Sequence, residues 1–455
     1  MFVAGYQALG TGYWLLGTAH RGSPACNPSP PSRCYNPASP MPQITPAALS
    51  DARIIAAYAV FAASYLVFAL GKFPGMKIDR PGAAIIGAVL MAAFRIVSPL
   101  QALRDIDFTT IVLLFSMMLI VGNLRLVGFF EWITGLVLRW VKPVHLLPTV
   151  IVTCGILSAF FVNDIICLVM VPLVLAVARR MNVRPLPYLL AVATASNIGS
   201  VATITGNPQN MLIGSYSGIS YRFFIAHMAP IAAVGLALDW AVLHWLFLPA
   251  EAPQPVIAEA VEFKGRPRAQ LGKPAVVVAL VVAGFFAGVP PAMMAAIGAA
   301  LLLITRTLEP RKVYQEIDWG LLVFFIGLFI IVGGAQRAGL VAGLLSLARP
   351  WDLQNSAVFT AVTAVLGNIV SNVPAVMLLK SLVPRFGNPH TTWLILAMAS
   401  TLSGNLTITG SVANIIVVES ARPEVEIRFR DYFRVGLPIT LATLVFGWAW
   451  LAVVR

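Results

Sequence analysis

Residues 195–210 read ASNIGSVATITGNPQN, and residues 399–414 read ASTLSGNLTITGSVAN. The two stretches align without a gap and share the leading Ala-Ser, the complete Thr-Ile-Thr-Gly run and the final Asn. Each lies inside an apolar segment long enough to cross a membrane, and Gly or Pro residues within it interrupt the helix. Non-helical backbone at membrane depth has to line a cavity or be buried in protein. The stretches therefore predict two broken helices around a polar site.

The composition excludes most other classes of protein. Hydrophobic residues make up 59% of the 455 residues and charged residues only 11%, whereas about a quarter of the residues of a soluble domain are charged. An ordinary soluble enzyme, a disordered protein and a typical nucleic-acid-binding protein are excluded, and we expect no nucleic acid partner. The net charge of +13 is assigned to cytoplasmic loops, where Lys and Arg concentrate in membrane proteins. The chain is predicted to be an all-α, polytopic protein of the lipid bilayer.

Apolar runs of membrane-spanning length recur from Arg53 onward. Two segments, about 145–178 and 354–385, are apolar but carry polar residues in the middle, so each could be one span or a re-entrant hairpin. The remaining runs predict crossing helices. We place these spans at about 54–71, 81–98, 107–124, 187–216, 223–248, 274–289, 292–306, 318–334, 391–418 and 431–454.

The motifs recur in the same order along the chain, which indicates an internal repeat. The run IDFTTIVLLFSMMLIVGNLRLVGFF at 106–130 has its counterpart in IDWGLLVFFIGLFIIVGGAQRAGLV at 317–341. Similarly, FVNDIICLVM at 161–170 aligns with IVSNVPAVML at 369–378. The expected boundaries are 51–250 for the first repeat, 251–272 for a cytoplasmic linker and 273–455 for the second repeat.

The loop charges predict how the two halves are inserted. With the loop at 72–80 inside, the cytoplasmic loops carry most of the Lys and Arg, provided that 145–178 and 354–385 each enter and leave on the same side. Each half then has about five crossings, one re-entrant helical hairpin and one broken helix. Because five is odd, the halves are inverted repeats, which is typical of secondary transporters. The chain is then a multi-pass protein of the cell (inner or plasma) membrane with its C-terminus outside.

The polar residues of the broken helices and hairpin tips predict one solute-binding site. Half-helix N-termini point their positive ends at such a site, and freed backbone and side-chain oxygens face it. Small polar residues also let helices pack closely, but two matched clusters at repeat-related positions favour binding. The predicted solute-binding residues are Asn163, Ser196, Asn197, Thr203, Thr205, Asn207, Asn210, Ser371, Asn372, Ser400, Thr401, Asn405, Thr407, Thr409 and Asn414.

Asp164 is the ionisable residue of this set. A carboxylate inside the membrane is costly and commonly functional, and burial favours its neutral form, so Asp164 is predicted to carry the coupling proton. Its repeat counterpart is Asn372, so only one half holds the acid. The alternative is a structural cap bonded to hairpin backbone. Arg125, Arg337 and Asp239 are instead expected to extend from apolar runs toward the membrane surface.

No motif indicates a cofactor, a metal site or ATP hydrolysis. The Cys and His residues lack metal-ligand spacing, and no Walker A sequence is present. Cys154 and Cys167 are expected to be core residues. Transport energy then comes from an ion gradient or from the gradient of the solute. Residues 1–50, rich in Pro and Ser at 24–46, are expected to be a disordered extension, or one added by a start codon placed too early.

These motifs resemble those of the ion transporter superfamily, specifically the arsenite efflux pump (ArsB) and related anion permeases, over about residues 51–455. The Asn-Asp pair at 163–164 looks like the hairpin motif of arsenite pumps. Ser-Asn-Ile-Gly-Ser at 196–200 resembles their broken-helix motif. By contrast, Thr-Gly-Asn-Pro-Gln-Asn at 205–210 departs from the pump pattern and is more similar to the wider permease branch.

The resemblance implies a scaffold part and an elevator-like transport part that holds both hairpins and both broken helices. The Ser-Asn pairs at 196–197 and 371–372 match the sodium-site motifs of dicarboxylate/sodium symporters only in part. A peripheral ATPase or a second copy of the chain is a candidate partner by the same resemblance.

Three transport functions, none of them enzymatic, fit these observations. The first is efflux of arsenite or antimonite in exchange for protons, because hydroxyl, amide and backbone groups without Arg or Lys suit a neutral polyhydroxylated solute. A citrate or sulfate site would more readily recruit a cation. The second is sodium- or proton-coupled transport of carboxylates or inorganic anions, and the third is sodium/proton exchange at Asp164. Inverted broken-helix repeats favour alternating access over a channel.

Overall fold

The computed structural model describes residues 51–71, 77–138, 141–247, 271–304, 308–340, 343, 346, 351–422 and 424–454. These residues form helices and no β-strand, so the all-α prediction is confirmed. The chain divides into residues 1–47 and 48–455, and all contacts below lie within the second unit. The predicted N-terminal extension at 1–50 and nearly all of the predicted linker at 251–272 lie outside the described residues.

Each predicted span of the first half overlaps a helix, or two helices in the case of 187–216. Asp107 starts one of them, because its carboxylate accepts hydrogen bonds from the backbone N–H groups of Thr109 (3.0 Å) and Thr110 (3.4 Å). The helices are α1 Asp51–Leu70, α2 Arg80–Ala93, α3 Pro99–Asp105, α4 Phe108–Leu126, α5 Phe129–Leu138, α6 Leu146–Phe160, α7 Asn163–Arg180, α8 Leu186–Ser200, α9 Pro208–Ser217 and α10 Tyr221–Phe247.

The second half repeats this order of helices. Asp318 starts its central helix in the same way, accepting from the backbone N–H of Leu321 at 2.9 Å. The helices are α11 Gly272–Phe286, α12 Pro291–Leu303, α13 Pro310–Gln315, α14 Trp319–Arg337, α16 Ser356–Val370, α17 Asn372–Leu379, α18 Pro389–Leu402, α19 Val412–Ala421 and α20 Phe429–Val453.

Five of the described helices are long and apolar enough to cross a membrane: α1, α4, α10, α14 and α20. Shorter apolar helices, among them α2, α11 and α12, accompany them. Large apolar side chains remain exposed on several of these helices, including Ile85 and Val89 on α2 and Trp245 on α10. Such faces suit contact with lipid, because the hydrocarbon core is itself apolar.

Both interrupted apolar segments form two helices in contact with each other. α6 and α7 are joined by residues 161–162, and α16 and α17 meet at Ser371. Both predicted broken helices are interrupted: residues 201–207 separate α8 from α9, and residues 403–411 separate α18 from α19. The Gly- and Pro-containing motifs therefore mark real ends of helices.

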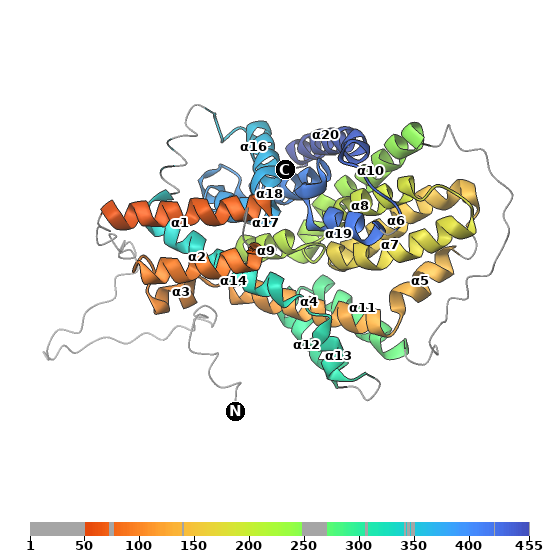
Figure 1. Ribbon diagram of the computed structural model, residues 1–455, viewed down its shortest axis with the longest axis horizontal. Helices are drawn as coiled ribbons and strands as arrows, with labels where there is room; N and C mark the ends of the chain where they lie inside the picture. The colour runs from red at the N-terminus through yellow and green to blue at the C-terminus, as the bar shows by residue number, and fades with distance from the viewer. Residues whose placement is uncertain are drawn as a thin grey trace, which may run out of the picture. The chain divides into compact units, whose positions relative to one another are not determined.

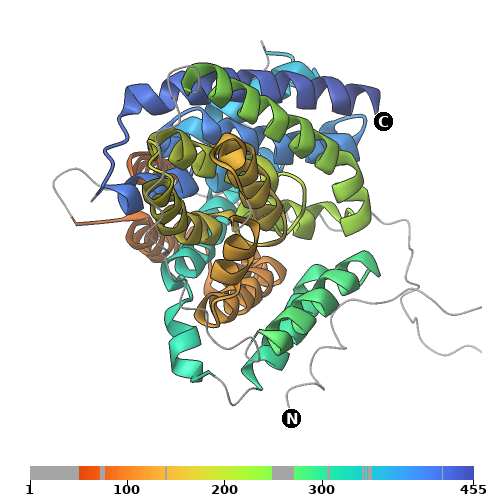
Figure 2. The same cartoon turned by 90° about the vertical axis from the view of Figure 1, so that its right-hand side faces the viewer.

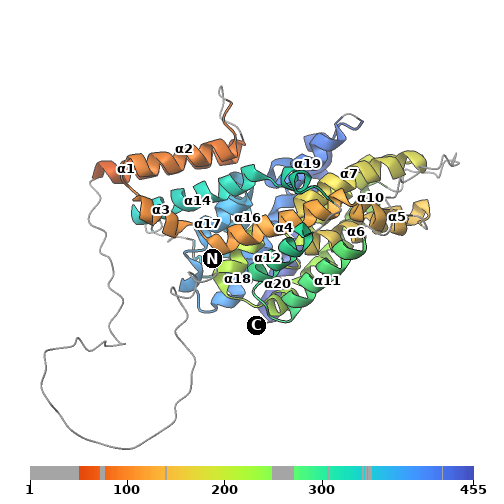
Figure 3. The same cartoon turned by 90° about the horizontal axis from the view of Figure 1, so that it is seen from below.

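Helices of each half pack against helices of the other half. α2 of the first half packs against α14 of the second, and α12 of the second packs against α4 of the first (Figure 3). The long helices α10 and α20 lie side by side (Figures 1 and 2). A two-fold relation between the halves gives such reciprocal contacts. The opposite insertion of the two halves in the membrane stays a prediction, because only the charges of the loops support it.

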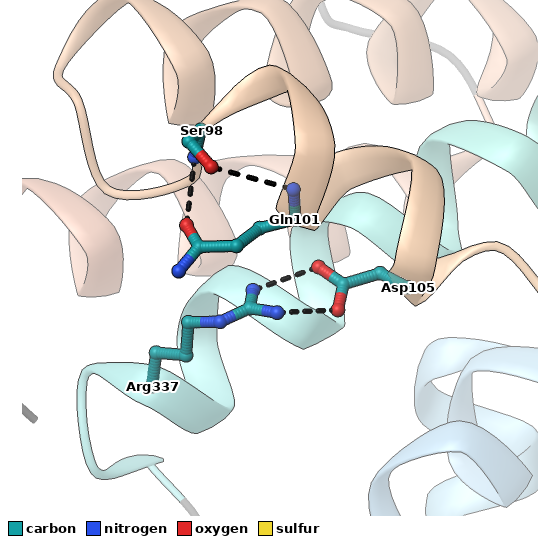
Figure 4. A network of polar contacts seen from close by, with 4 residues as sticks. All are labelled: Ser98, Gln101, Asp105 and Arg337. Atoms are coloured by element: carbon teal, nitrogen blue, oxygen red, sulfur yellow. Dashed lines mark hydrogen bonds and ion pairs between the residues drawn. The ribbon is translucent and has the colours of Figure 1, made fainter. Parts of the chain in front are cut away.

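Two ion pairs follow the same reciprocal pattern. Arg125 at the end of α4 pairs with Glu316, just before α14, at 2.8 Å. Arg337 at the end of α14 reaches both carboxylate oxygens of Asp105 at the end of α3, at 2.7 and 2.6 Å (Figure 4). Rather than extending freely toward the membrane surface, each arginine binds a carboxylate of the other half.

Candidate solute-binding site

Asn197 is the centre of a buried amide network. It lies in the last turns of α8 and is 1% exposed. Its side-chain oxygen accepts from Asn163 Nδ2 and from the hydroxyl of Ser411, both at 3.0 Å. Its nitrogen donates to the Oδ1 atoms of Asn405 and Asn414, both at 2.9 Å. Because these bonds use both protons and both lone pairs of the amide, Asn197 joins the first hairpin tip to the second broken helix.

Backbone carbonyls fix the orientation of these amides. Asn414 Nδ2 donates to the carbonyl of Gly404 at 2.7 Å, and Asn405 Nδ2 donates to that of Thr194 at 3.3 Å. The oxygens of both side chains must then face Asn197 and accept from it. The oxygen of Asn197 is consequently left to accept from the hairpin tip.

Two buried amide oxygens at the hairpin tips have no hydrogen-bond partner among the described residues. They are the Oδ1 atoms of Asn163 and Asn372. Asn163 already donates to Asn197, so its free atom is an acceptor. Asn372 lies against the second broken helix, since a Cβ on Gly404 would come 3.2 Å from its amide nitrogen. Leaving buried acceptors unpaired is costly, so both tips are ready to accept hydrogen bonds or to contact a cation.

The first broken helix is held by the same bonds as the second. Asn210 Nδ2 donates to the carbonyl oxygens of Ser200 at 3.1 Å and Thr203 at 3.0 Å. In the second half, the aligned Asn414 makes the two equivalent bonds, at 2.7 and 3.0 Å. The final Asn of each quoted stretch therefore pairs the carbonyls that the break in the helix leaves free.

Contacts between the two broken helices are reciprocal at the level of single residues. Asn207 Nδ2 donates to Thr401 Oγ1 at 3.3 Å. Ser411, which aligns with Asn207, donates to Asn197, which aligns with Thr401. The two polar clusters predicted from the repeat thus meet across the boundary between the halves. Their role in binding solute stays a prediction.

Several other predicted residues hold the helix breaks rather than joining the network around Asn197. Thr205 shares a hydrogen bond of 3.1 Å with the hydroxyl of Tyr221 on α10. Thr409 is exposed and shares a bond of 3.4 Å with Thr407. The predicted residues that form no side-chain hydrogen bond with Asn197 in the described part of the chain include Ser196, Thr203, Thr205, Ser400 and Thr409.

The sequence prediction missed two polar residues that belong here. Asn368 on α16 donates to the carbonyl of Ser403 at 2.8 Å and accepts from the hydroxyl of Thr407 at 3.3 Å. Ser411 was also absent from the predicted set. Both are polar residues in apolar surroundings, and the alignment of Ser411 with Asn207 was the signal that could have identified it.

Asp164 lies in the first turn of α7, next to Asn163, and is partly exposed. The charges of Arg80, at the start of α2, and of Asp318, at the start of α14, act on its carboxyl group. The acid therefore lies where the first hairpin tip approaches α2 and α14, which pack against each other. Hydrogen bonds within the network around Asn197 involve no Lys or Arg among the described residues.

Ser371, at the second hairpin tip, has strained backbone angles of φ 77° and ψ 156°. This region is almost exclusive to glycine and costs another residue about 1–3 kcal/mol. Such strain is found at functional sites, where the surrounding structure holds it in place.

Replacing Ser371 with glycine is expected to raise the free energy of unfolding by about 1–2 kcal/mol, because glycine adopts these angles without the steric cost. Thermal unfolding of the purified protein in detergent measures this gain. Ser371→Ala is the matched control, since it removes the hydroxyl but keeps the Cβ and hence the strain. Equal stability of the glycine and alanine variants would show that the backbone strain is absent.

Paired hairpins, two broken helices and a buried amide network at their meeting point define a helical membrane transporter of the ion transporter superfamily. The chain belongs to the CitMHS citrate transporter family, whose characteristic sequence matches residues 65–402.

Relatives cover nearly the whole of the chain. An uncharacterized transporter of Mycobacterium tuberculosis is 30% identical over 414 residues, which cover 86% of this chain and 96% of the relative. The silicon efflux transporter LSI3 of Oryza sativa subsp. japonica is 29% identical over 471 residues, covering 87% and 97%. The crystal structure of the YdaH transporter of Alcanivorax borkumensis has a similar fold, with a TM-score of 0.52, 15% identity and coverage of 88% and 96%.

Proposed function

We propose that this protein exports arsenite or antimonite across the cell inner membrane in exchange for protons, by an elevator-type alternating-access mechanism. The choice of solute rests on two buried amide oxygens at the hairpin tips, those of Asn163 and Asn372, which have no hydrogen-bond partner among the described residues. Free acceptors need hydrogen-bond donors. Arsenite near neutral pH is a small, mostly uncharged molecule whose hydroxyl groups are such donors.

A carboxylate or inorganic anion is less well matched to these atoms. Citrate and sulfate carry mainly acceptor oxygens, which would face the acceptor oxygens of Asn163 and Asn372. Anion sites in proteins commonly supply Arg or Lys for charge-assisted hydrogen bonds. The amide network has no such partner among the described residues, and citrate transport is therefore the alternative rather than the proposal.

Silicic acid is a second candidate solute. The relative LSI3 is named a silicon efflux transporter, and silicic acid, like arsenite, presents hydroxyl donors on a small neutral molecule. The same two tip oxygens could pair with either solute. Sodium is a candidate for the same oxygens, because amide carbonyls are ligands that hard cations accept, and this keeps sodium/proton exchange as an alternative.

The proposed cycle assigns different roles to the two groups of helices. The pairs α2–α14 and α4–α12, which pack across the boundary between the halves, form the scaffold. The hairpins and broken helices form the part that moves. Asp164 carries the proton at the boundary between them. In this arrangement the halves are inverted repeats with boundaries at 51–250 and 273–455, and the C-terminus lies outside.

Binding can be tested without reconstituting transport. A ligand at 100 times its Kd stabilises the folded state by about 2.7 kcal/mol. Arsenite is expected to raise the Tm of the purified protein, and citrate is not. The Asn163→Ala variant is expected to lose this shift, whereas Asn123→Ala, at a buried asparagine of α4, is expected to keep it. Stabilisation by citrate, with none by arsenite or silicic acid, would replace the proposal with the anion alternative.

A further inference from the structure

A fully buried carboxyl group, distinct from Asp164, lies behind the amide network. Asp239, on α10, is 0% exposed, so the expectation that it reaches the membrane surface is wrong. Its Oδ1 is 2.8 Å from the hydroxyl oxygen of Thr194 on α8. Its Oδ2 has no hydrogen-bond partner among the described residues. A carboxyl group in this position is either ionised without a balancing cation or protonated.

The hydroxyl of Thr194 indicates which of the two states is present. The oxygen Thr194 Oγ1 also lies 2.9 Å from the carbonyl oxygen of Leu190, one turn earlier on α8. A hydroxyl has one proton to donate. If that proton goes to Leu190, as is common for threonine inside a helix, the contact with Asp239 needs a proton from the acid. Each of the two short contacts has a proton of its own only when Asp239 is protonated.

The ionisable neighbours of Asp239 supply no positive charge. Cys154 of α6 and Tyr432 of α20 lie within electrostatic range of Asp239, and neither of them becomes a cation. α11 and α18 contact α10 nearer its start, around Tyr221 and Phe223. An ionised carboxylate in this buried place would lack the pairing that buried charges require.

The packing of α10 on α20 shows which turn of α20 lies level with Asp239. A Cβ on Gly447 would lie 3.2 Å from Ile231, and one on Gly235 would lie 3.4 Å from Thr443. The two helices therefore run antiparallel here, so that each later turn of α10 lies against an earlier turn of α20. Asp239, one turn beyond Gly235, is therefore level with Ile439 of α20, one turn before Thr443.

The residue after Ile439 is Thr440, which is 2% exposed and whose hydroxyl has no partner among the described residues. Asp239 Oδ2 and Thr440 Oγ1 are thus two unpaired polar atoms at a similar level of the contact between α10 and α20. A few hydroxyl and carboxyl oxygens are too few for a hard cation, which gathers about six or more oxygen ligands. They are sufficient for a proton.

Thr194 connects this acid to the candidate solute site. Its backbone carbonyl accepts from Asn405 Nδ2 at 3.3 Å, and it lies one turn before Asn197 on α8. Thr194 therefore contacts Asp239 through its side chain and the amide network through its backbone carbonyl.

We propose that Asp239 is a second proton-binding site of the transporter, protonated in this conformation and exchanging its proton as Thr194 changes partner. In the protonated state the acid donates to Thr194, which donates to Leu190. When the proton leaves to water, the carboxylate accepts from Thr194, which then releases the carbonyl of Leu190. The proposal rests on the proposed transport cycle for its role, but the protonation itself can be measured without any solute.

Infrared difference spectroscopy of the purified full chain tests this inference through the carbonyl band of protonated carboxylic acids. At neutral pH we expect a band that Asp239→Asn removes, that Asp239→Glu shifts and that Asp164→Asn leaves in place. The band should exchange in deuterated buffer and disappear reversibly as the pH rises. Thr194→Val should displace its frequency and titration midpoint, whereas Thr194→Ser should keep both near wild type.

Two results would overturn the inference. Absence at neutral pH of any band that depends on Asp239 would show that the group is ionised. A band that neither exchanges in deuterated buffer nor titrates would show a permanently neutral structural acid. Failure of arsenite binding would leave these readouts unchanged, so the two proposals fail independently.

Discussion

Replacing Asn197 with alanine is expected to lower solute transport by at least about 100-fold, more than any other single change in the network. The substitution removes hydrogen bonds to the hairpin tip and to the second broken helix at once. Two lost bonds of about 1.5 kcal/mol each already correspond to roughly a factor of 100. Uptake of arsenite into proteoliposomes, normalised to the amount of folded protein, measures the effect.

Two variants separate function from folding in this experiment. Asn197→Thr copies the residue found at the aligned position, Thr401, and should retain part of the activity because a hydroxyl can still accept and donate. Asn123→Ala removes a buried asparagine of α4 and should transport like wild type. Wild-type transport by folded Asn197→Ala would show that the amide network does not assemble the site.

Replacing Asp164 with asparagine is expected to abolish accumulation driven by a pH gradient while leaving solute exchange intact. The amide has nearly the same shape as the carboxyl but cannot take up and release a proton. A pH difference of one unit stores about 1.4 kcal/mol per proton, enough for about tenfold accumulation. In the variant, the inside-to-outside ratio of solute should fall to about one, as measured in vesicles with an imposed gradient.

Exchange of labelled against unlabelled solute, without a gradient, is the internal control for this variant. We expect an exchange rate within about a factor of two to three of wild type, because Asn163 and Asn372 keep their oxygens. Gradient-driven accumulation that persists in Asp164→Asn would remove Asp164 from the coupling mechanism. It would then direct attention to Asp239.

The helices and their breaks could be predicted from the sequence because their causes are local. Apolar runs of membrane length set the spans, and Gly and Pro in the quoted stretches set the interruptions at 201–207 and 403–411. The alignment of those stretches also predicted that the polar clusters correspond. The reciprocal bonds of Asn207 to Thr401 and of Ser411 to Asn197 are the structural form of that correspondence.

Contacts between distant segments could not be predicted in the same way. The ion pairs of Arg125 with Glu316 and of Arg337 with Asp105 depend on the packing of helices across the boundary between the halves. Asp239 looked like a residue near a helix end, because the sequence does not show that α8 and α20 enclose it. Hydropathy reports how apolar a run is, not which side chains meet across it.

The structure also changes the interpretation of the site itself. From the sequence, every polar residue of the clusters was an equal candidate for binding solute. The amide of Asn197, however, already forms four hydrogen bonds with other side chains, whereas Asn163 and Asn372 each have a side-chain oxygen without a partner among the described residues. The hairpin tips are therefore the expected solute contacts, and the network behind them sets their position.

Proton-coupled arsenite export is tested most directly by solute accumulation in inverted membrane vesicles with an imposed proton gradient and without sodium. Arsenite, silicic acid and citrate are compared in parallel, with and without the gradient. We expect proton-driven, sodium-independent accumulation of arsenite, and none of citrate. Accumulation of citrate alone, or no movement of arsenite in any condition, would contradict the proposal, and accumulation of silicic acid alone would favour the second candidate.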